Sequence, residues 1–167
     1  MVVALEARNG RHLQRYYKGS RQVVGCIPYR VVDNGKDFEV LMISSQRKGK
    51  GMLFPKGGWE KDESIEDAAL RETEEEAGVK GIIGKQLGKW IFKSNGNDVY
   101  HEGHMFPLCV EELLDLWPEK DIRSREWMSA SDAKKVCQQW WMKEALDLLV
   151  DRFTAPQPQK LDLEVVL

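Results

Sequence analysis

Two runs of β-branched and aromatic residues mark the start of the regular pattern in the chain. They cover residues 22–32 (QVVGCIPYRVV) and 38–45 (FEVLMISS), with the turn sequence Asp-Asn-Gly at 33–35 between them. Residues of these types favour strands and tight turns respectively, so the pattern predicts a β-hairpin or a strand pair. A third short strand is expected at 51–55, where Pro55 ends it.

The pattern changes to that of a helix at residues 64–77. No Pro or Gly interrupts this segment, and Ser64 followed by Asp67 has the spacing of a capping box. Gly78 is typical of the position after a helix C-terminus. Helical spacing of apolar residues returns over residues 131–152, which predicts a second, continuous helix.

The second expected helix carries its apolar residues as a stripe at helical spacing. The stripe consists of Val136, Trp140, Ala145, Leu148 and Leu149. We interpret Trp140 and its neighbour Trp141 as packing residues rather than as a platform on which a base stacks.

Further strands are expected at 86–93, 103–110 and 125–128, where β-branched or aromatic residues recur between turn signals. The segment after 154 is rich in Pro and Gln. We therefore predict one domain over residues 1–153, followed by a flexible tail at 154–167.

Composition supports a single globular domain. The chain has 167 residues, of which 42% are hydrophobic and 31% charged. Roughly 18 uninterrupted apolar residues would be needed for a membrane span, and no run of that length occurs. The first residues lack the pattern of a secretory signal, and the three cysteines fit free thiols in a reducing compartment. We expect a cytoplasmic or nuclear protein, while arginines near the N-terminus keep a mitochondrial address open.

Charge is divided unevenly along the chain. Residues 1–56 carry 11 Lys and Arg against 4 Asp and Glu, a balance of +7, and the remainder has a balance of −9. Such a division suits a site in which basic groups hold a polyanion and acidic groups hold a metal ion beside it. Charges dispersed over a solvated surface would give the same count.

Three glutamates gather on one face of the helix expected at 64–77. With 100° per residue, Glu72, Glu75 and Glu76 fall within an arc of about 100°. Like charges at this spacing repel, whereas a divalent ion such as Mg²⁺ or Mn²⁺ binds carboxylate oxygens. Arg71 lies beside the arc and is a candidate catalytic residue that orients a glutamate. A solvated acidic helix face is the alternative.

The same stretch resembles the Nudix box, G-x5-E-x7-R-E-U-x-E-E-x-G-U, in which U is a bulky aliphatic residue. Gly57, Glu63 and residues 71–79 (RETEEEAGV) match it, and only Thr73 departs from it. The resemblance implies an α/β (α+β) fold in which a mixed β-sheet is sandwiched between helices. It also implies hydrolysis of a nucleoside or other organic diphosphate linked to a further moiety.

The resemblance assigns roles to individual residues of the box. Glu72 and Glu76 would bind Mg²⁺, with Mn²⁺ as an alternative, and a backbone carbonyl at Lys56 or Gly57 would complete the set. Glu75 would act as general base or as another metal ligand. The implied reaction is attack of an activated water on one phosphorus with a second phosphate as leaving group.

Similarity beyond the box extends over about residues 10–150 and is closest to phosphohydrolases of diphosphoinositol polyphosphates and diadenosine polyphosphates. Both substrates are dense anions, and the sequence does not separate them. The basic and polar residues implied to bind substrate are Arg11, Lys18, Arg21, Ser45, Arg47, Lys48, Lys56, Arg123 and Arg125, with Lys50 near the mouth of the site.

Several alternatives remain open at this point. The chain could act on another nucleoside diphosphate derivative or on an mRNA cap, although an acidic C-terminal part disfavours a nucleic acid partner. A non-catalytic Nudix module that senses a nucleotide is a different class. His101 and His104 are either acid-base groups or bystanders, and the oligomeric state is undetermined.

Overall fold

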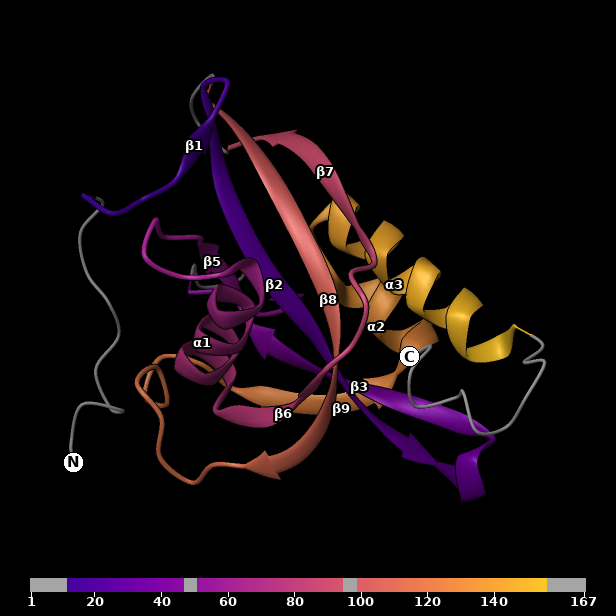
Figure 1. Ribbon diagram of the computed structural model, residues 1–167. Helices are drawn as coiled ribbons and strands as arrows, with labels where there is room; N and C mark the ends of the chain where they lie inside the picture. Colours follow the sequence, from indigo (N-terminus) through magenta and orange to yellow (C-terminus); the bar gives the residue numbers. More distant parts are fainter. Residues whose placement is uncertain (1–11, 47–50, 95–98, 156–167) are drawn as a thin grey trace.

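The computed structural model describes residues 12–46, 51–94 and 99–155. A mixed nine-stranded sheet lies at its centre, with one helix on one side and two on the other (Figure 1). The strands are β1 (Tyr16–Tyr17), β2 (Ser20–Val32), β3 (Asp37–Ser44), β4 (Met52–Leu53), β5 (Lys56–Gly58), β6 (Val79–Ile83), β7 (Gly88–Lys93), β8 (Tyr100–Leu113) and β9 (Arg125–Ser129). The helices are α1 (Ile65–Ala77), α2 (Ala130–Val136) and α3 (Trp140–Thr154), with a 3₁₀ turn, η2, at Asp33–Gly35. The expected sheet between helices is confirmed.

Two long strands form the middle of the sheet. β2 and β8 run parallel from the Arg21–His101 pair to the Tyr29–Cys109 pair. β3 pairs antiparallel with β2, and β6 and β7 pair antiparallel with different parts of β8. β5 also pairs with β2, so the segment that precedes α1 is fixed beside the central strands.

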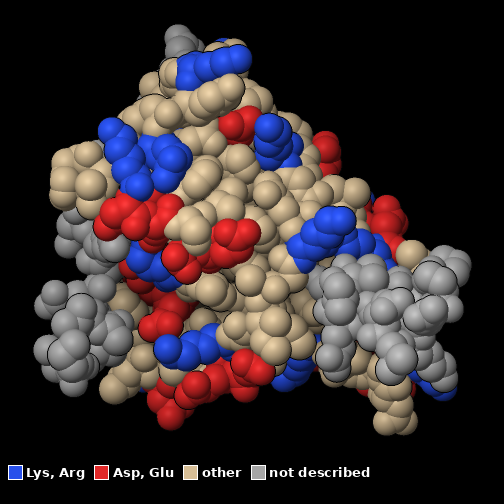
Figure 2. All heavy atoms as spheres, in the orientation of Figure 1, with Lys and Arg blue, Asp and Glu red and all other residues tan. Residues whose placement is uncertain are grey.

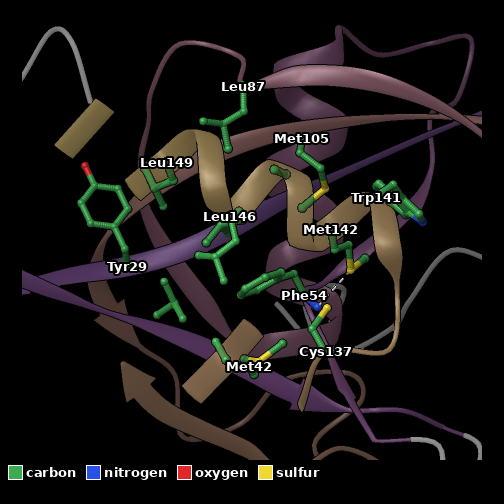
Figure 3. Close-up of a cluster of buried hydrophobic side chains, with 14 of the residues drawn as sticks. Tyr29, Met42, Phe54, Leu87, Met105, Cys137, Trp141, Met142, Leu146 and Leu149 are labelled. Carbon is green, nitrogen blue, oxygen red and sulfur yellow. Dashed lines mark hydrogen bonds between the residues drawn. The ribbon is translucent and has the colours of Figure 1, made fainter. Parts of the chain in front are cut away.

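The sheet buries apolar side chains on both faces. Alternate residues of a strand point to opposite sides, and apolar residues of β2 occupy both sets of positions. Val24 and Cys26 of β2 pack in the cluster beneath α1. Ile27 and Tyr29 of the same strand pack in the cluster beneath α2 and α3. Figure 3 shows side chains of this second cluster, in which Leu146 and other residues of α3 meet the sheet. Each helical layer therefore has a core of its own.

The predicted limits of α1 are confirmed. Ser64 is the N-cap, and its hydroxyl accepts a hydrogen bond of 3.0 Å from the backbone N–H of Asp67. Gly78 ends the helix in the left-handed region, at φ +64°. A side chain at Gly78 would also collide with the ring of Trp117, so glycine is required there for two reasons.

The single helix expected at 131–152 is wrong, because the chain leaves the helical conformation between α2 and α3. Cys137 is extended, at φ −70° and ψ 126°, and forms a parallel bridge with Met52. The backbone N–H of Gln138 donates to the carbonyl of Met52 at 3.3 Å. Pairing with β4 thus replaces helical hydrogen bonds at this point.

The break changes which residues of the expected apolar stripe are buried. Val136, Trp140 and Leu148 are exposed, whereas Ala145 and Leu149 are buried as expected. The buried side chains of α3 are Trp141, Met142, Ala145, Leu146 and Leu149. Trp141 is therefore a core residue, and the packing role expected for Trp140 is wrong.

α3 ends at Thr154, close to the boundary predicted between domain and tail. The division into residues 1–153 and 154–167 stays a prediction, because residues 156–167 lie outside the described residues. Within the described ranges, no helix is both long enough and apolar enough to span a bilayer. Cys26, Cys109 and Cys137 are free thiols.

Candidate active site

The three glutamates of the box lie on the buried side of α1. Glu72, Glu75 and Glu76 are only 8–9% exposed. Small residues of α1, Ala68 and Ala69, pack against the sheet and hold the helix close to it. The glutamates are therefore not a solvated acidic face, and their charges need partners within the protein.

Arg71 is the main partner of these carboxylates. Its Nη1 donates to Glu72 Oε1 at 2.8 Å and to Glu75 Oε2 at 3.3 Å. Its Nε donates to Glu63 Oε2 at 2.9 Å, and its Nη2 donates to the carbonyl of Gly58. Burial alone would lower the pKa of Arg71, but the hydrogen bond with Glu63 and the nearby carboxylates raise it. The guanidinium is therefore a permanent positive charge inside the cluster.

Glu76 has a second set of partners. Its Oε1 accepts a hydrogen bond of 3.1 Å from the backbone N–H of Lys56 and lies 3.5 Å from Arg123 Nη2. Arg123 is held in turn by Glu119, at 2.9 Å from its Nε, and by the carbonyl of Ser44 at 2.8 Å from its Nη1. Two arginines thus neutralise opposite sides of the carboxylate cluster.

Burial shifts the ionisation of two of the glutamates. Burial first, and then the charge of Glu76, raise the pKa of Glu72 to about 8. Burial raises the pKa of Glu76 to about 7, although Arg123 and Lys56 oppose this shift. A nearby cation would stabilise the ionised forms of both groups.

The donor set suits a hard divalent cation, although it is not assembled as a closed site. Among the residues described, no three His, Cys, Asp or Glu side chains converge as a formed metal centre. Arg71 instead donates hydrogen bonds to Glu72 and Glu75, and Arg123 lies beside Glu76. Gly57 has room for Glu72 only because it lacks a side chain, since a Cβ there would overlap the Glu72 carboxylate. The loop backbone and two buried carboxylates therefore meet at one place.

A pocket of about 720 Å³ adjoins Glu76. Its charged lining consists of Lys56, Glu76, Lys93 and Arg123. Its ring-bearing lining consists of Phe92, His101 and Trp140, and the remaining lining is Ser45, Gln46, Leu53, Ser94, Gln138 and Gln139. The pocket lining therefore combines cationic side chains, among them Lys56 and Arg123 near Glu76, with aromatic rings.

Of the predicted substrate-binding residues, Ser45, Lys56 and Arg123 come together in this pocket. Lys18 and Arg21 are not among its described lining residues. Lys18 lies over the ring of Tyr17, and Arg21 Nε donates to Gln14 Oε1 at 2.9 Å. The predictions for Arg11, Arg47, Lys48 and Lys50 fall outside the described residues.

Arg125 has a different position from the one expected for a substrate-binding residue. Its guanidinium lies 4.0 Å from the centre of the Trp117 ring and donates to the carbonyls of Ala77, Gly78 and Leu114. These carbonyls include the end of α1. Arg125 therefore closes the C-terminus of this helix, and we no longer include it in the proposed substrate-binding set.

The two histidines also differ. His104 is buried, and its ring nitrogens lie 2.8 Å from Gln22 Oε1 and 3.2 Å from Gln86 Nε2. Burial lowers its pKa, which favours a neutral, structural imidazole. His101 lines the pocket and makes an edge contact with Phe92.

The charge division along the sequence does not become a division in space. In Figure 2, acidic and basic side chains lie interleaved over the region of α1. Lys56 comes from the basic part of the chain, but Lys93 and Arg123 come from the acidic part. The cations of the pocket lining are therefore assembled by the fold from both parts.

Residues that the sequence did not indicate as part of the site include Glu63, Glu119, Lys93 and Trp140. Glu63 holds Arg71, and its position in the box could have indicated this role. Glu119, Lys93 and Trp140 carry no motif, and only the fold brings them to the pocket or to Arg123.

Comparison with known proteins shows which family the chain resembles. The NUDIX domain family matches residues 20–149. The chain is 55% identical over 163 residues to Nudix hydrolase 17, mitochondrial, of Arabidopsis thaliana, covering 95% of this chain and 89% of the relative. It is 39% identical over 123 residues to diphosphoinositol polyphosphate phosphohydrolase 3-alpha of Mus musculus, covering 72% and 71%.

Solved structures share the fold at low sequence identity. An Ap4A hydrolase of C. elegans in a binary complex has a TM-score of 0.60 at 21% identity. The match covers 77% of this chain and 94% of the hydrolase chain. A NUDIX hydrolase of Nitrosomonas europaea has a TM-score of 0.65 at 18% identity, with 78% and 88% covered. The box, its buried carboxylates and these similarities lead to one conclusion: the chain belongs to the Nudix family and is a pyrophosphohydrolase.

Proposed function

We propose that the protein is a Mg²⁺-dependent phosphohydrolase that cleaves the diphosphate of diphosphoinositol polyphosphates. The observation that carries this proposal is the pocket in which Glu76 of the box adjoins Lys56, Lys93 and Arg123. A compact, highly charged anion requires several cations beside the catalytic carboxylates. The 39% identity to a mouse diphosphoinositol polyphosphate phosphohydrolase supports the same substrate class.

Nudix hydrolases generally use divalent metal ions, and the donors here suit Mg²⁺, with Mn²⁺ as an alternative. Glu72 and Glu76 would hold the ion together with a backbone carbonyl of Lys56 or Gly57, and Glu75 is a further candidate ligand. When bound, the ion polarises phosphate oxygens and lowers the pKa of water.

The protein's own residues would then carry out the remaining steps. Glu75 accepts the proton of the attacking water, and Arg71, 3.3 Å away, keeps this carboxylate oriented. The water oxygen bonds to phosphorus as the bridging P–O bond breaks, and the leaving phosphate takes that electron pair. Lys56 and Arg123 stabilise the charge that develops on the phosphate oxygens.

A dinucleoside polyphosphate such as a diadenosine polyphosphate is the second candidate substrate. The aromatic lining of the pocket favours it, since Phe92 and Trp140 offer surfaces that a base requires. An mRNA cap or another nucleoside diphosphate derivative ranks lower. A non-catalytic sensing module is disfavoured because Glu72, Glu75 and Glu76 are all present.

The compartment remains a prediction. Nudix hydrolase 17, at 55% identity, and Nudix hydrolase 18, at 56% identity, are both named mitochondrial in Arabidopsis thaliana. These names make a mitochondrial location plausible beside the cytoplasmic one expected from the sequence.

The test compares initial rates on equal concentrations of a diphosphoinositol pentakisphosphate and diadenosine hexaphosphate, with Mg²⁺ present. We expect faster loss of the β-phosphate from the inositol compound. Glu75→Gln should lower this rate by about 10²- to 10⁴-fold while circular dichroism stays unchanged, as expected for loss of a general base. Unchanged turnover in this variant would reject α1 as the catalytic element.

A further inference from the structure

The aromatic rings that line the pocket, Phe92 and Trp140, are not explained by an inositol polyphosphate substrate. Such a substrate offers phosphate oxygens to Lys56, Lys93 and Arg123, but it has no planar group that would gain from contact with a ring. Trp140 also lines the pocket, yet its side chain is 52% exposed. A large indole surface facing a polar pocket needs a different explanation.

The break between α2 and α3 determines where this indole lies. Gln138 bonds to the carbonyl of Met52, Gln139 is still extended, and α3 begins at Trp140. The next residue, Trp141, is 1% exposed and stacks on Phe92, with ring centres 4.5 Å apart and planes inclined by 11°. Gly103 gives Trp141 this space, because a Cβ there would press against its ring.

The two adjacent tryptophans therefore have opposite roles. Trp141 is anchored in the core, and successive residues of a helix point about 100° apart. With Trp141 fixed inward, Trp140 is directed to the pocket. It is the first residue of α3 and does not belong to the core cluster that contains Trp141.

The cations and the aromatic rings of the pocket lining together match one ligand class. Phosphates require the cations near Glu76, and a planar base gains from an exposed aromatic face. Both features lie in one cavity of about 720 Å³, within the size range of ligand sites. A nucleoside polyphosphate contains both groups in a single molecule.

We propose that Trp140 is a specificity-determining residue that stacks on the base of a nucleoside polyphosphate while the phosphates extend toward Lys56 and Arg123. This inference rests on the proposed hydrolytic site and names the residue that would select the second candidate substrate. Trp140 selects among polyphosphates and takes no part in proton transfer.

The first test measures kcat/KM for diadenosine hexaphosphate and for a diphosphoinositol pentakisphosphate in Trp140→Ala and Trp140→Phe. Alanine should lower the ratio of dinucleotide to inositol kcat/KM roughly tenfold or more, mainly through KM, because base stacking on a side chain has that magnitude. Phenylalanine should recover most of the ratio. Leu148→Ala, an exposed position of α3 outside the described pocket lining, is the matched control.

A binding measurement separates this inference from the proposed function. In the Glu75→Gln background, diadenosine hexaphosphate should quench indole fluorescence more than inositol hexakisphosphate does, and Trp140→Phe should abolish the difference. This result would support base stacking even if neither compound were hydrolysed. An equal fall of kcat/KM on both substrates in Trp140→Ala, or quenching that Trp140→Phe leaves intact, would overturn the inference.

Discussion

The two faces of the sheet differ in what their helices bury. α1 places Glu72, Glu75 and Glu76 against the sheet beside alanines. α3 places Trp141 and Leu146, with other apolar side chains, against the opposite face (Figure 3). The α1 face buries carboxylates beside an apolar cluster of its own, whereas the α3 face buries mainly apolar side chains.

This difference separates chemistry from stability. Buried like charges cost free energy unless they are paired, and Arg71 and Arg123 provide that pairing on the α1 face. Burial of apolar side chains on the α3 face stabilises the fold. Substitutions of the α1 carboxylates should therefore lower activity more than stability, and substitutions in the α3 core should lower stability more than activity.

The largest expected effect is on the α1 face. Glu72→Gln removes a buried carboxylate that we propose to hold the metal ion and whose burial raises its pKa to about 8. We expect activity to fall by on the order of 10²-fold or more, the usual scale for a single catalytic group. We also expect the unfolding midpoint without divalent ions to rise by about 3 °C.

Glu74→Gln is the matched control for this variant. Glu74 lies on the same helix, but it pairs with Lys80 at 3.2 Å and is not among the buried residues of α1. Turnover and thermal scans should both stay close to those of the wild type. A large loss of stability in Glu72→Gln would show that this carboxylate is structural.

On the α3 face, Leu146→Ala should have the reverse signature. Removing a fully buried leucine costs about 2–5 kcal/mol of unfolding free energy, because it leaves a cavity. Urea titration measures this loss, and kcat per folded molecule should change little. The exposed Leu148, changed to Ala, should cost much less, and equal losses at the two positions would contradict the packing described.

The smallest expected effect is a dependence of stability on pH. The pKa values of Glu72, about 8, and Glu76, about 7, lie above that of an unfolded glutamate, so the folded state binds protons more tightly. Their contribution to stability is complete below about pH 4.5 and is lost as pH rises through 7 to 8. Thermal scans with a chelator should record this loss.

Added Mg²⁺ should reverse the loss, since it binds the ionised carboxylates. The difference in unfolding midpoint with and without Mg²⁺ should therefore widen from about pH 6 to about pH 9. A difference that is constant with pH would show that these carboxylates do not bind the ion.

The sequence predicted α1 well because its signals are local. Ser64 and Gly78 act within one turn of the helix ends, and the glutamates follow from a fixed spacing. The break at 137–139 was not predictable in this way, because it depends on pairing of Cys137 with Met52, which is distant in sequence. The different exposure of Trp140 and Trp141, which were both expected to pack, follows from that break.

Arg125 illustrates a second limit of the sequence. Its family position implied a contact with substrate, but its place over Trp117 beside the end of α1 is set by tertiary structure. Residue type specifies what a guanidinium can bind. Only the fold determines whether carbonyls or phosphates are within its reach.

The position of Arg71 among the carboxylates has a consequence for how the enzyme is assembled. Many small metal sites fold only when the ion is available, because their unpaired ligands repel. Here Arg71 serves as an internal counter-ion that pairs with Glu72, Glu75 and Glu63 and lowers their mutual repulsion. We therefore expect newly made chains to reach the native state in surroundings poor in divalent ions.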